Sequence, residues 1–62
     1  MSLDINEITA KLHDAYPYHY HVGMGTIRAI IGGRSASPFA KVRDIKTVLA
    51  ALDTVLHERE LR

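Results

Sequence analysis

The chain contains no cysteine and no long run of apolar residues. The absence of cysteine excludes disulfide bonds, thiolate metal sites and cysteine nucleophiles. The longest uninterrupted apolar run covers only residues 48–52, which is far too short to cross a membrane, and no segment resembles a signal peptide. We therefore expect a soluble cytoplasmic protein that has no membrane partner.

The net charge is also small. The chain has 8 basic and 7 acidic residues, which leaves a formal charge of +1, so the molecule as a whole is not a polyelectrolyte. Its 62 residues allow a single domain. A chain of this size buries only about 60% of the surface that its unfolded form exposes, so its core is marginal unless a metal or a partner subunit supports it.

Residues 3–16 have the pattern of a helix with a defined start. Asp4 is suited to cap the free backbone amides, and Glu7 follows at the spacing of a capping box. Pro17 disfavours helical geometry at the residue before it, so the helix is predicted to end there. The apolar residues that recur at steps of three and four are Ile5, Ile8 and Leu12.

The middle of the chain fits two structures. Residues 18–22 begin with alternating tyrosine and histidine, which is typical of a strand with the tyrosines on one side and the histidines on the other. Gly23 and Gly25 interrupt this alternation and suggest a turn, and residues 26–31, which are rich in β-branched side chains, fit the second strand of a hairpin. The same six residues also fit a short helix that ends at Gly32. Of these two alternatives we favour the hairpin.

Residues 38–60 are predicted to form a long helix, which Ser37 caps and Pro38 begins. Its apolar stripe is wider than a small core requires, because Val48 and Val55 broaden it. A helix of about 23 residues is roughly 34 Å long, and a short helix with a small hairpin covers only part of it. We therefore expect a homodimer or higher oligomer, and the plainer interpretation is a monomer whose long helix frays after Leu56. The predicted oligomer interface consists of Val42, Ile45, Leu49, Leu52 and Leu56.

Basic residues gather in the middle of the chain. Residues 26–46 hold five basic residues and one acidic residue, a net charge of +4, whereas the flanking segments are slightly acidic. This basic segment surrounds a loop of glycine and serine at the amino end of the long helix, where free amides and the helix dipole attract anions. Lys41 opposes that dipole, which favours a negatively charged ligand there. The predicted phosphate-binding residues are Arg28, Gly32, Gly33, Arg34, Ser35, Ser37, Lys41 and Arg43.

Both structures for the middle segment lead to this loop. A strand, a glycine loop and a helix form a general arrangement for holding phosphate, whereas two helices joined by a Gly-Gly turn make a rough helix-turn-helix. The net charge is low for a DNA-binding protein, and a nucleotide needs fewer cations. A capped turn with scattered surface charge is the plainer interpretation. The loop lacks the glycine spacing of nucleotide-hydrolysing and dinucleotide-binding loops.

The segment rich in tyrosine and histidine is a second candidate site. Amphipathic rings are frequent at partner surfaces, and core packing is the plainer interpretation. The predicted partner surface consists of Tyr18, His19, Tyr20 and His21. These two histidines do not complete a zinc site even with His13 or Asp14 nearby, so we expect no metal and no cofactor.

No nucleophile, base and acid assemble into a catalytic set, so we expect no enzyme activity. The predicted fold is α+β, a small self-associating single domain with a helix, a short hairpin and a long C-terminal helix. The leading hypothesis is a non-catalytic binding or regulatory protein that recognises a nucleic acid or a nucleotide through its phosphate. The alternative is a protein-interaction module or inhibitor that uses the tyrosine-histidine segment or the exposed helix face.

Overall fold

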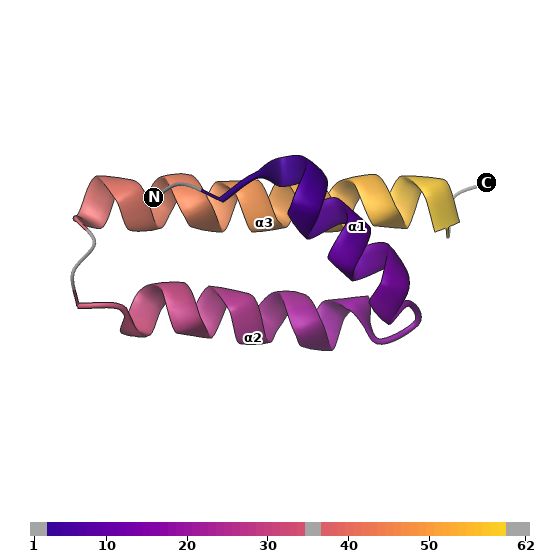
Figure 1. Ribbon diagram of the computed structural model, residues 1–62, viewed down its shortest axis with the longest axis horizontal. Coiled ribbons are helices and arrows are strands. Elements are labelled where there is room, and N and C mark those ends of the chain that lie inside the picture. The colour runs from indigo at the N-terminus through magenta and orange to yellow at the C-terminus, as the bar shows by residue number, and fades with distance from the viewer. Residues whose placement is uncertain (1–2, 35–36, 60–62) are drawn as a thin grey trace.

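The computed structural model describes residues 3–34 and 37–59, and in them the chain forms three helices (Figure 1). These are α1 (Ile5–Ala15), α2 (His19–Gly32) and α3 (Pro38–Arg59). The described residues contain no strand, so the α+β prediction is wrong and the fold is all-helical. None of the three helices combines the length and the apolar character needed to cross a membrane.

The predicted first helix is confirmed, with its cap. The Asp4 carboxylate accepts a hydrogen bond from the Asn6 backbone N–H at 2.8 Å, and the Asp4 carbonyl accepts one from the Ile8 N–H at 3.1 Å. Both bonds satisfy amides that a helix start would otherwise leave free. The last helical residue is Ala15, and the C-cap residue is Tyr16. Pro17 follows Tyr16 and disfavours helical geometry there, so the helix ends where the sequence predicts.

The predicted hairpin is wrong, because one continuous helix, α2, occupies the segment. The strand expected over residues 18–22 is the start of this helix. An alternation of tyrosine and histidine over four residues is too short to specify a period of two, and packing against the other helices decides the structure instead. The alternative, a short helix that Thr26 caps and Gly32 ends, is correct in that these residues are helical and α2 ends at Gly32, but wrong at its start, because Thr26 lies inside α2.

Glycines that suggested a turn lie inside α2. A Cβ atom at Gly23 would stand 2.9 Å from the Leu52 Cδ1 atom, so glycine allows α2 and α3 to approach closely there. A Cβ atom at Gly25 would meet no heavy atom of its surroundings within 4 Å. Gly23 therefore lies at a close contact between two helices, whereas Gly25 faces open space.

The start of α3 is confirmed as predicted. The Ser37 hydroxyl accepts a hydrogen bond from the Ala40 backbone N–H at 3.2 Å, and the Ser37 carbonyl accepts one from the Lys41 N–H at 3.0 Å. Pro38 occupies the first helical position, where its missing N–H costs no helical hydrogen bond. The final residue of the predicted helix, Glu60, lies outside the described residues.

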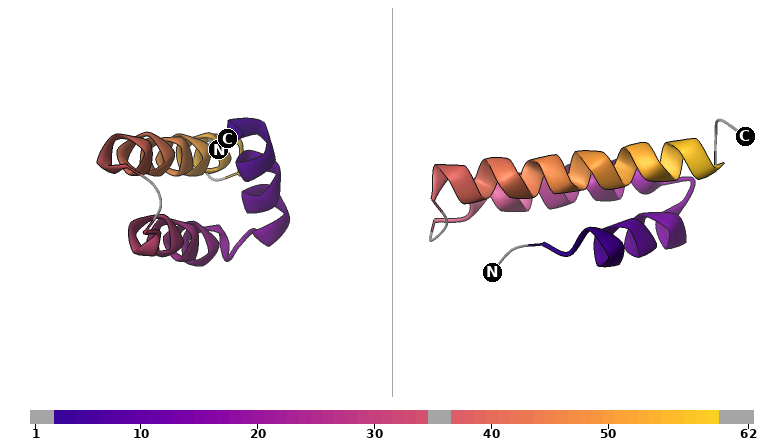
Figure 2. Two further views of the ribbon diagram at one scale, coloured as in Figure 1. Left: turned by 60° about the vertical axis from the view of Figure 1, so that its left-hand side comes forward. Right: turned by 90° about the horizontal axis from the view of Figure 1, so that it is seen from above.

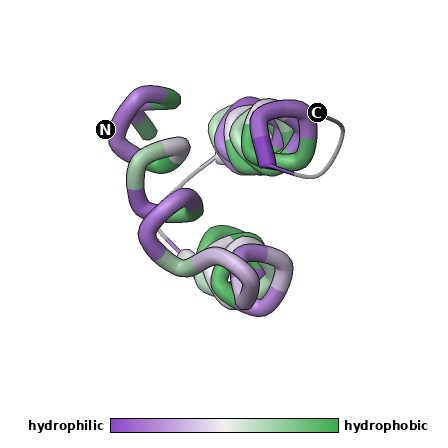
Figure 3. Tube along the Cα trace, turned by 90° about the vertical axis from the view of Figure 1, so that its right-hand side faces the viewer, coloured by the Kyte–Doolittle hydropathy of each residue, from purple (hydrophilic) through white to green (hydrophobic). Residues whose placement is uncertain are grey.

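α2 and α3 run antiparallel side by side, and α1 crosses one side of this pair (Figures 1 and 2). Viewed along the bundle, α1 lies on one side of the α2–α3 pair and no described element lies on the other (Figure 3). The buried apolar side chains come from α1 and α3, and α2 contributes partly buried residues. The buried set is Leu12, Val48, Ala51, Leu52 and Val55, with Val22, Ile27 and Ile30 of α2 against it.

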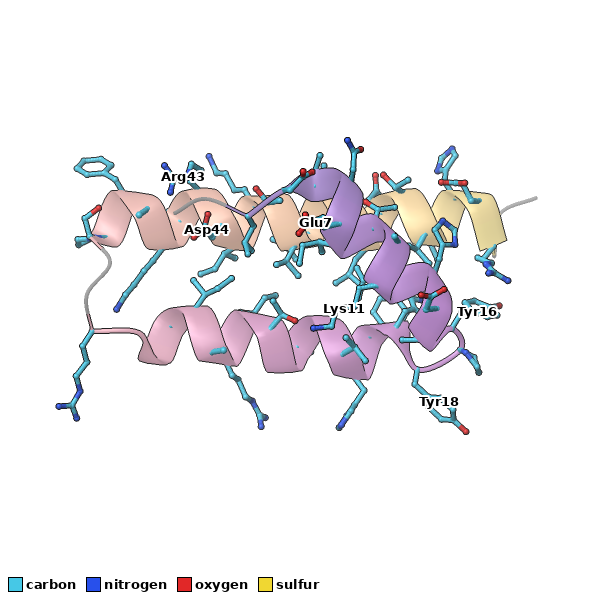
Figure 4. All side chains as sticks on the ribbon, in the orientation of Figure 1. Glu7, Lys11, Tyr16, Tyr18, Arg43 and Asp44 are labelled. Atoms are coloured by element: carbon cyan, nitrogen blue, oxygen red, sulfur yellow. The ribbon has the colours of Figure 1, made fainter. Side chains whose placement is uncertain are left out.

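Polar contacts hold α1 against α3 at both ends. The Leu3 backbone N–H donates to the Asp44 carboxylate at 3.5 Å. At the other end, the Arg59 Nε–H donates to His13 Nδ1 at 3.1 Å, and His13 Nε2 lies 3.4 Å from the Glu58 carboxylate. The Arg59 guanidinium also lies over the Tyr16 ring, 5.1 Å from its centre (Figure 4 labels Tyr16). These contacts fix which side of the pair α1 covers.

Candidate functional site

The predicted phosphate loop joins the end of α2 to the start of α3. Gly32 is the last residue of α2, and Gly33 is its C-cap, whose N–H donates to the Ile30 carbonyl at 3.2 Å. Arg28 and Arg34 are exposed. Ser35 lies outside the described residues.

Three of the predicted phosphate ligands make contacts within the chain. The Lys41 ammonium donates to the Ile31 carbonyl at 3.1 Å, so this cation faces the negative end of the α2 dipole. The Ser37 hydroxyl caps α3, and Arg43 Nε lies 3.4 Å from the Asp44 carboxylate. The position of Lys41 therefore has a structural explanation that needs no anion. Phosphate binding stays a prediction that the described contacts at residues 28–34 and 37–43 do not test.

The structure separates the four residues of the predicted tyrosine-histidine surface. His19 is only 1% exposed, and its ring stacks on Tyr16 at 5.1 Å and packs against Tyr20 at 4.4 Å between ring centres. Tyr18, Tyr20 and His21 are exposed. The prediction that both histidines lie on one exposed side is therefore wrong, because residues two apart share a face of a strand but lie about 200° apart around a helix.

The residues of the predicted oligomer interface on α3 also differ in their burial. Leu52 is buried within its own chain, so it belongs to the core and not to a free surface. Val42 and Leu49 are exposed, whereas Ile45 and Leu56 are half-buried. The core positions are those that broadened the stripe, Val48 and Val55, together with Ala51 and Leu52.

An apolar surface that both long helices build lies on the side of the pair away from α1. On α2 its residues follow helical spacing from Tyr20 through Met24 to Ile31, and all three are exposed. A groove of about 200 Å³ joins Tyr20 to Leu49, Leu52, Asp53 and Leu56 of α3, which places the two stripes on one face. We call this surface the two-helix face. Its residues are Tyr20, Met24, Ile31, Ile45, Leu49 and Leu56.

A second groove lies on the outer side of α3. It is shallow and open to solvent, has a volume of about 660 Å³ and is lined by Ile5, Phe39, Val42, Arg43, Lys46, Thr47 and Ala50. We call it the outer groove. Phe39 is 90% exposed, and Arg43, Lys46 and Ala50 follow it at intervals of four, three and four residues along α3. Lys46 and Ala50 are each two residues from the buried Val48, about 200° around the helix, so this line faces away from the core.

Sequence reasoning missed both the α2 half of the two-helix face and the role of Phe39. The α2 residues were assigned to a hairpin, which hid their helical spacing. Phe39 is the only phenylalanine of the chain, and its place directly after Pro38 drew attention to capping alone. A helical reading of residues 20–31 would have found the first signal, since apolar residues recur there at steps of four, three and four.

Among residues 3–34 and 37–59, no three histidine, aspartate or glutamate side chains form a group able to hold a metal ion. Comparisons of the chain with protein-family models, with curated proteins and with solved structures found no match. The function is therefore argued from the two exposed surfaces themselves.

Proposed function

We propose that the protein is a non-catalytic interaction module that works as a homodimer, with the two-helix face of one copy packed on the same face of a second. The α2–α3 pairs of two copies then form a four-helix bundle, and each α1 lies on its outside. The observation that carries this proposal is the continuous apolar face on the side that α1 leaves uncovered.

The exposure of individual side chains supports this pairing. Met24 and Leu49 are each 52% exposed, and they lie on adjacent helices rather than as isolated surface residues. Burying a fully exposed side chain of this size contributes about 1.5 to 3 kcal/mol, so covering one that is about half exposed contributes roughly half of that. A contiguous patch of such residues is typical of an interface.

The extent of the molecule limits the size of such a contact. The chain measures 38 Å by 16 Å in the view of Figure 1. The product, about 600 Å², is the projected area of the whole molecule on that side, so a contact confined to the two-helix face is at the small end of interfaces, below the roughly 800 Å² that each partner buries in a standard one.

Sedimentation equilibrium tests this proposal. The wild-type chain is expected to approach a mass of about 13.8 kDa, twice the 6.9 kDa of one chain, as its concentration rises. The double variant Met24→Asp, Leu49→Asp places two charges on the face and is expected to stay monomeric with unchanged helix content. Phe39→Asp, on the outer groove, is the matched control and keeps the dimer. A wild-type chain that stays monomeric at high concentration contradicts the proposal.

A further inference from the structure

We infer that the outer groove binds an acidic amphipathic segment of another protein, with an apolar side chain beside Phe39 and carboxylates on Arg43 and Lys46. This inference is independent of the dimer, because the groove-lining residues Phe39, Lys46 and Ala50 face away from the core and are not part of the two-helix face. A dimer would present two such grooves.

The apolar part of the groove suits a side chain from a partner. Phe39 is 90% exposed, and Ile5 and Val42 beside it are also exposed. These three come from two elements, α1 and α3, so they form the walls of a recess rather than a single ridge. Aromatic anchors that enter or line such recesses carry most of the binding energy in many interfaces.

The charged part of the groove selects an acidic partner. Arg43 and Lys46 are both exposed and lie three residues apart, so their heads project from the same side of α3. Arg43 contacts Asp44 through its Nε atom at 3.4 Å, which offsets part of its charge (Figure 4 labels both residues). A guanidinium carries further N–H donors suited to a second carboxylate. Asp44 is mostly buried and also accepts the Leu3 N–H, so Lys46 and the outer N–H groups of Arg43 are the cationic groups that face a partner.

A second copy of the chain is a poor occupant for this groove. The α3 residues that line it run from Phe39 to Ala50, so an antiparallel pairing about their centre sets Arg43 against Lys46 of the second copy. A parallel pairing sets each cation against itself. Both arrangements bring like charges together, which disfavours self-association here. An acidic segment reverses the sign of this interaction.

A nucleic acid fits the groove less well than a peptide does. Only two of the seven lining residues are cationic, and four are apolar, namely Ile5, Phe39, Val42 and Ala50. Affinity for nucleic acids rests on several neutralised phosphates, and the chain has a net charge of only +1. The mixture of an apolar recess and a small cationic rim matches recognition of an amphipathic helix in a groove.

Fluorescence polarisation with a labelled synthetic peptide tests the inference. The peptide forms an amphipathic helix, with leucines at i, i+4 and i+7 and glutamates beside them, and a second peptide carries glutamine in place of each glutamate. The glutamate peptide is expected to bind the wild-type chain, with an affinity that falls as salt is added. Phe39→Ala is expected to weaken binding about tenfold or more, and Lys46→Gln is expected to reduce the salt dependence.

Phe39 and Lys46 are both exposed, so Phe39→Ala and Lys46→Gln remove no core contact. Circular dichroism verifies that both variants fold. Met24→Ala, an exposed apolar change on the two-helix face, is the matched control and leaves peptide affinity unchanged. The monomeric double variant Met24→Asp, Leu49→Asp is also expected to bind, which separates this inference from the dimer proposal. Equal binding by Phe39→Ala, equal binding of the glutamine peptide, or binding of an oligonucleotide with none of the peptide would overturn it.

Discussion

The two ends of the α2–α3 pair differ in what covers them. At one end, which we call the covered half, α1 packs across the start of α2 and the second half of α3 (Figure 1). In the described chain every buried residue lies in α1, in residues 19–23 or in residues 48–55. At the other end, the open half, no described residue from 24 to 47 is buried.

Composition does not explain this difference, because the open half is rich in large apolar residues. What differs is the number of helices. α1 has 11 residues and α3 has 22, so α1 spans about 16 Å beside a helix of about 33 Å. Three helices enclose a core, whereas two leave each apolar stripe half in water. The apolar residues of the open half are therefore left exposed to a partner, whereas in the covered half only those on the side away from α1, such as Tyr20 and Leu49, are exposed.

The sharpest contrast between the halves is expected from truncating one apolar side chain in each. Leu12 of α1 is 1% exposed, and Leu12→Ala is expected to reduce the free energy of unfolding by about 3 kcal/mol. A chain of this length has a total stability of roughly 3 to 9 kcal/mol, so the variant approaches global unfolding. Ile31 is 59% exposed, and Ile31→Ala is expected to cost about 0.5 kcal/mol or less in the monomer.

Urea denaturation followed by circular dichroism measures both changes, at a protein concentration low enough to keep the chain monomeric. The ratio of the two effects is the quantity of interest. Similar losses of unfolding free energy for Leu12→Ala and Ile31→Ala would show that the open half is as well packed as the covered half, and the comparison would fail.

A smaller effect distinguishes the two glycines at the boundary between the halves. Gly25→Ala places a methyl group in open space and replaces a poor helix former, so it is expected to stabilise the chain by about 0.5 to 1 kcal/mol. Gly23→Ala gains the same helical preference but pushes against Leu52 at 2.9 Å, and overpacking costs about 1 to 3 kcal/mol. We expect Gly23→Ala to be the less stable variant by about 1 kcal/mol or more.

Thermal and urea denaturation of the two glycine variants, compared with the wild type, checks this order. Each variant is the control for the other, because both change glycine to alanine inside the same helix. If Gly23→Ala stabilises the chain as much as Gly25→Ala does, α2 and α3 do not approach closely at this point.

Sequence reasoning succeeded where the determinant of structure is local. Asp4 caps α1 and Ser37 caps α3 because each side chain bonds an amide two or three residues away, and such spacing is visible in the sequence. The prediction for the segment between them was wrong because the structure of that segment depends on a contact with a distant part of the chain. By its sequence context Gly23 is typical of a turn, and only the folded structure shows that Leu52 of α3 lies beside it.

The candidate sites show the same division between local and distant causes. Lys41 suggested an anion site, but its ammonium bonds the Ile31 carbonyl, a partner that only the antiparallel arrangement of α2 and α3 brings near. Similarly, the spacing of apolar residues on α3 indicated an excess of apolar surface without indicating which residues stay exposed. Leu52 turned inward and Leu49 outward because α2 packs against one side of α3.

Amide hydrogen exchange at low and high protein concentration most directly tests the central claim that a second copy covers the two-helix face where α1 does not. Exchange protection measures the free energy of local opening at each backbone amide. In the monomer, we predict lower protection in residues 24–47 than in residues 48–55. As the concentration rises, protection in the open half is predicted to increase more than in the covered half. Protection that is equal in both halves and independent of concentration would contradict the account.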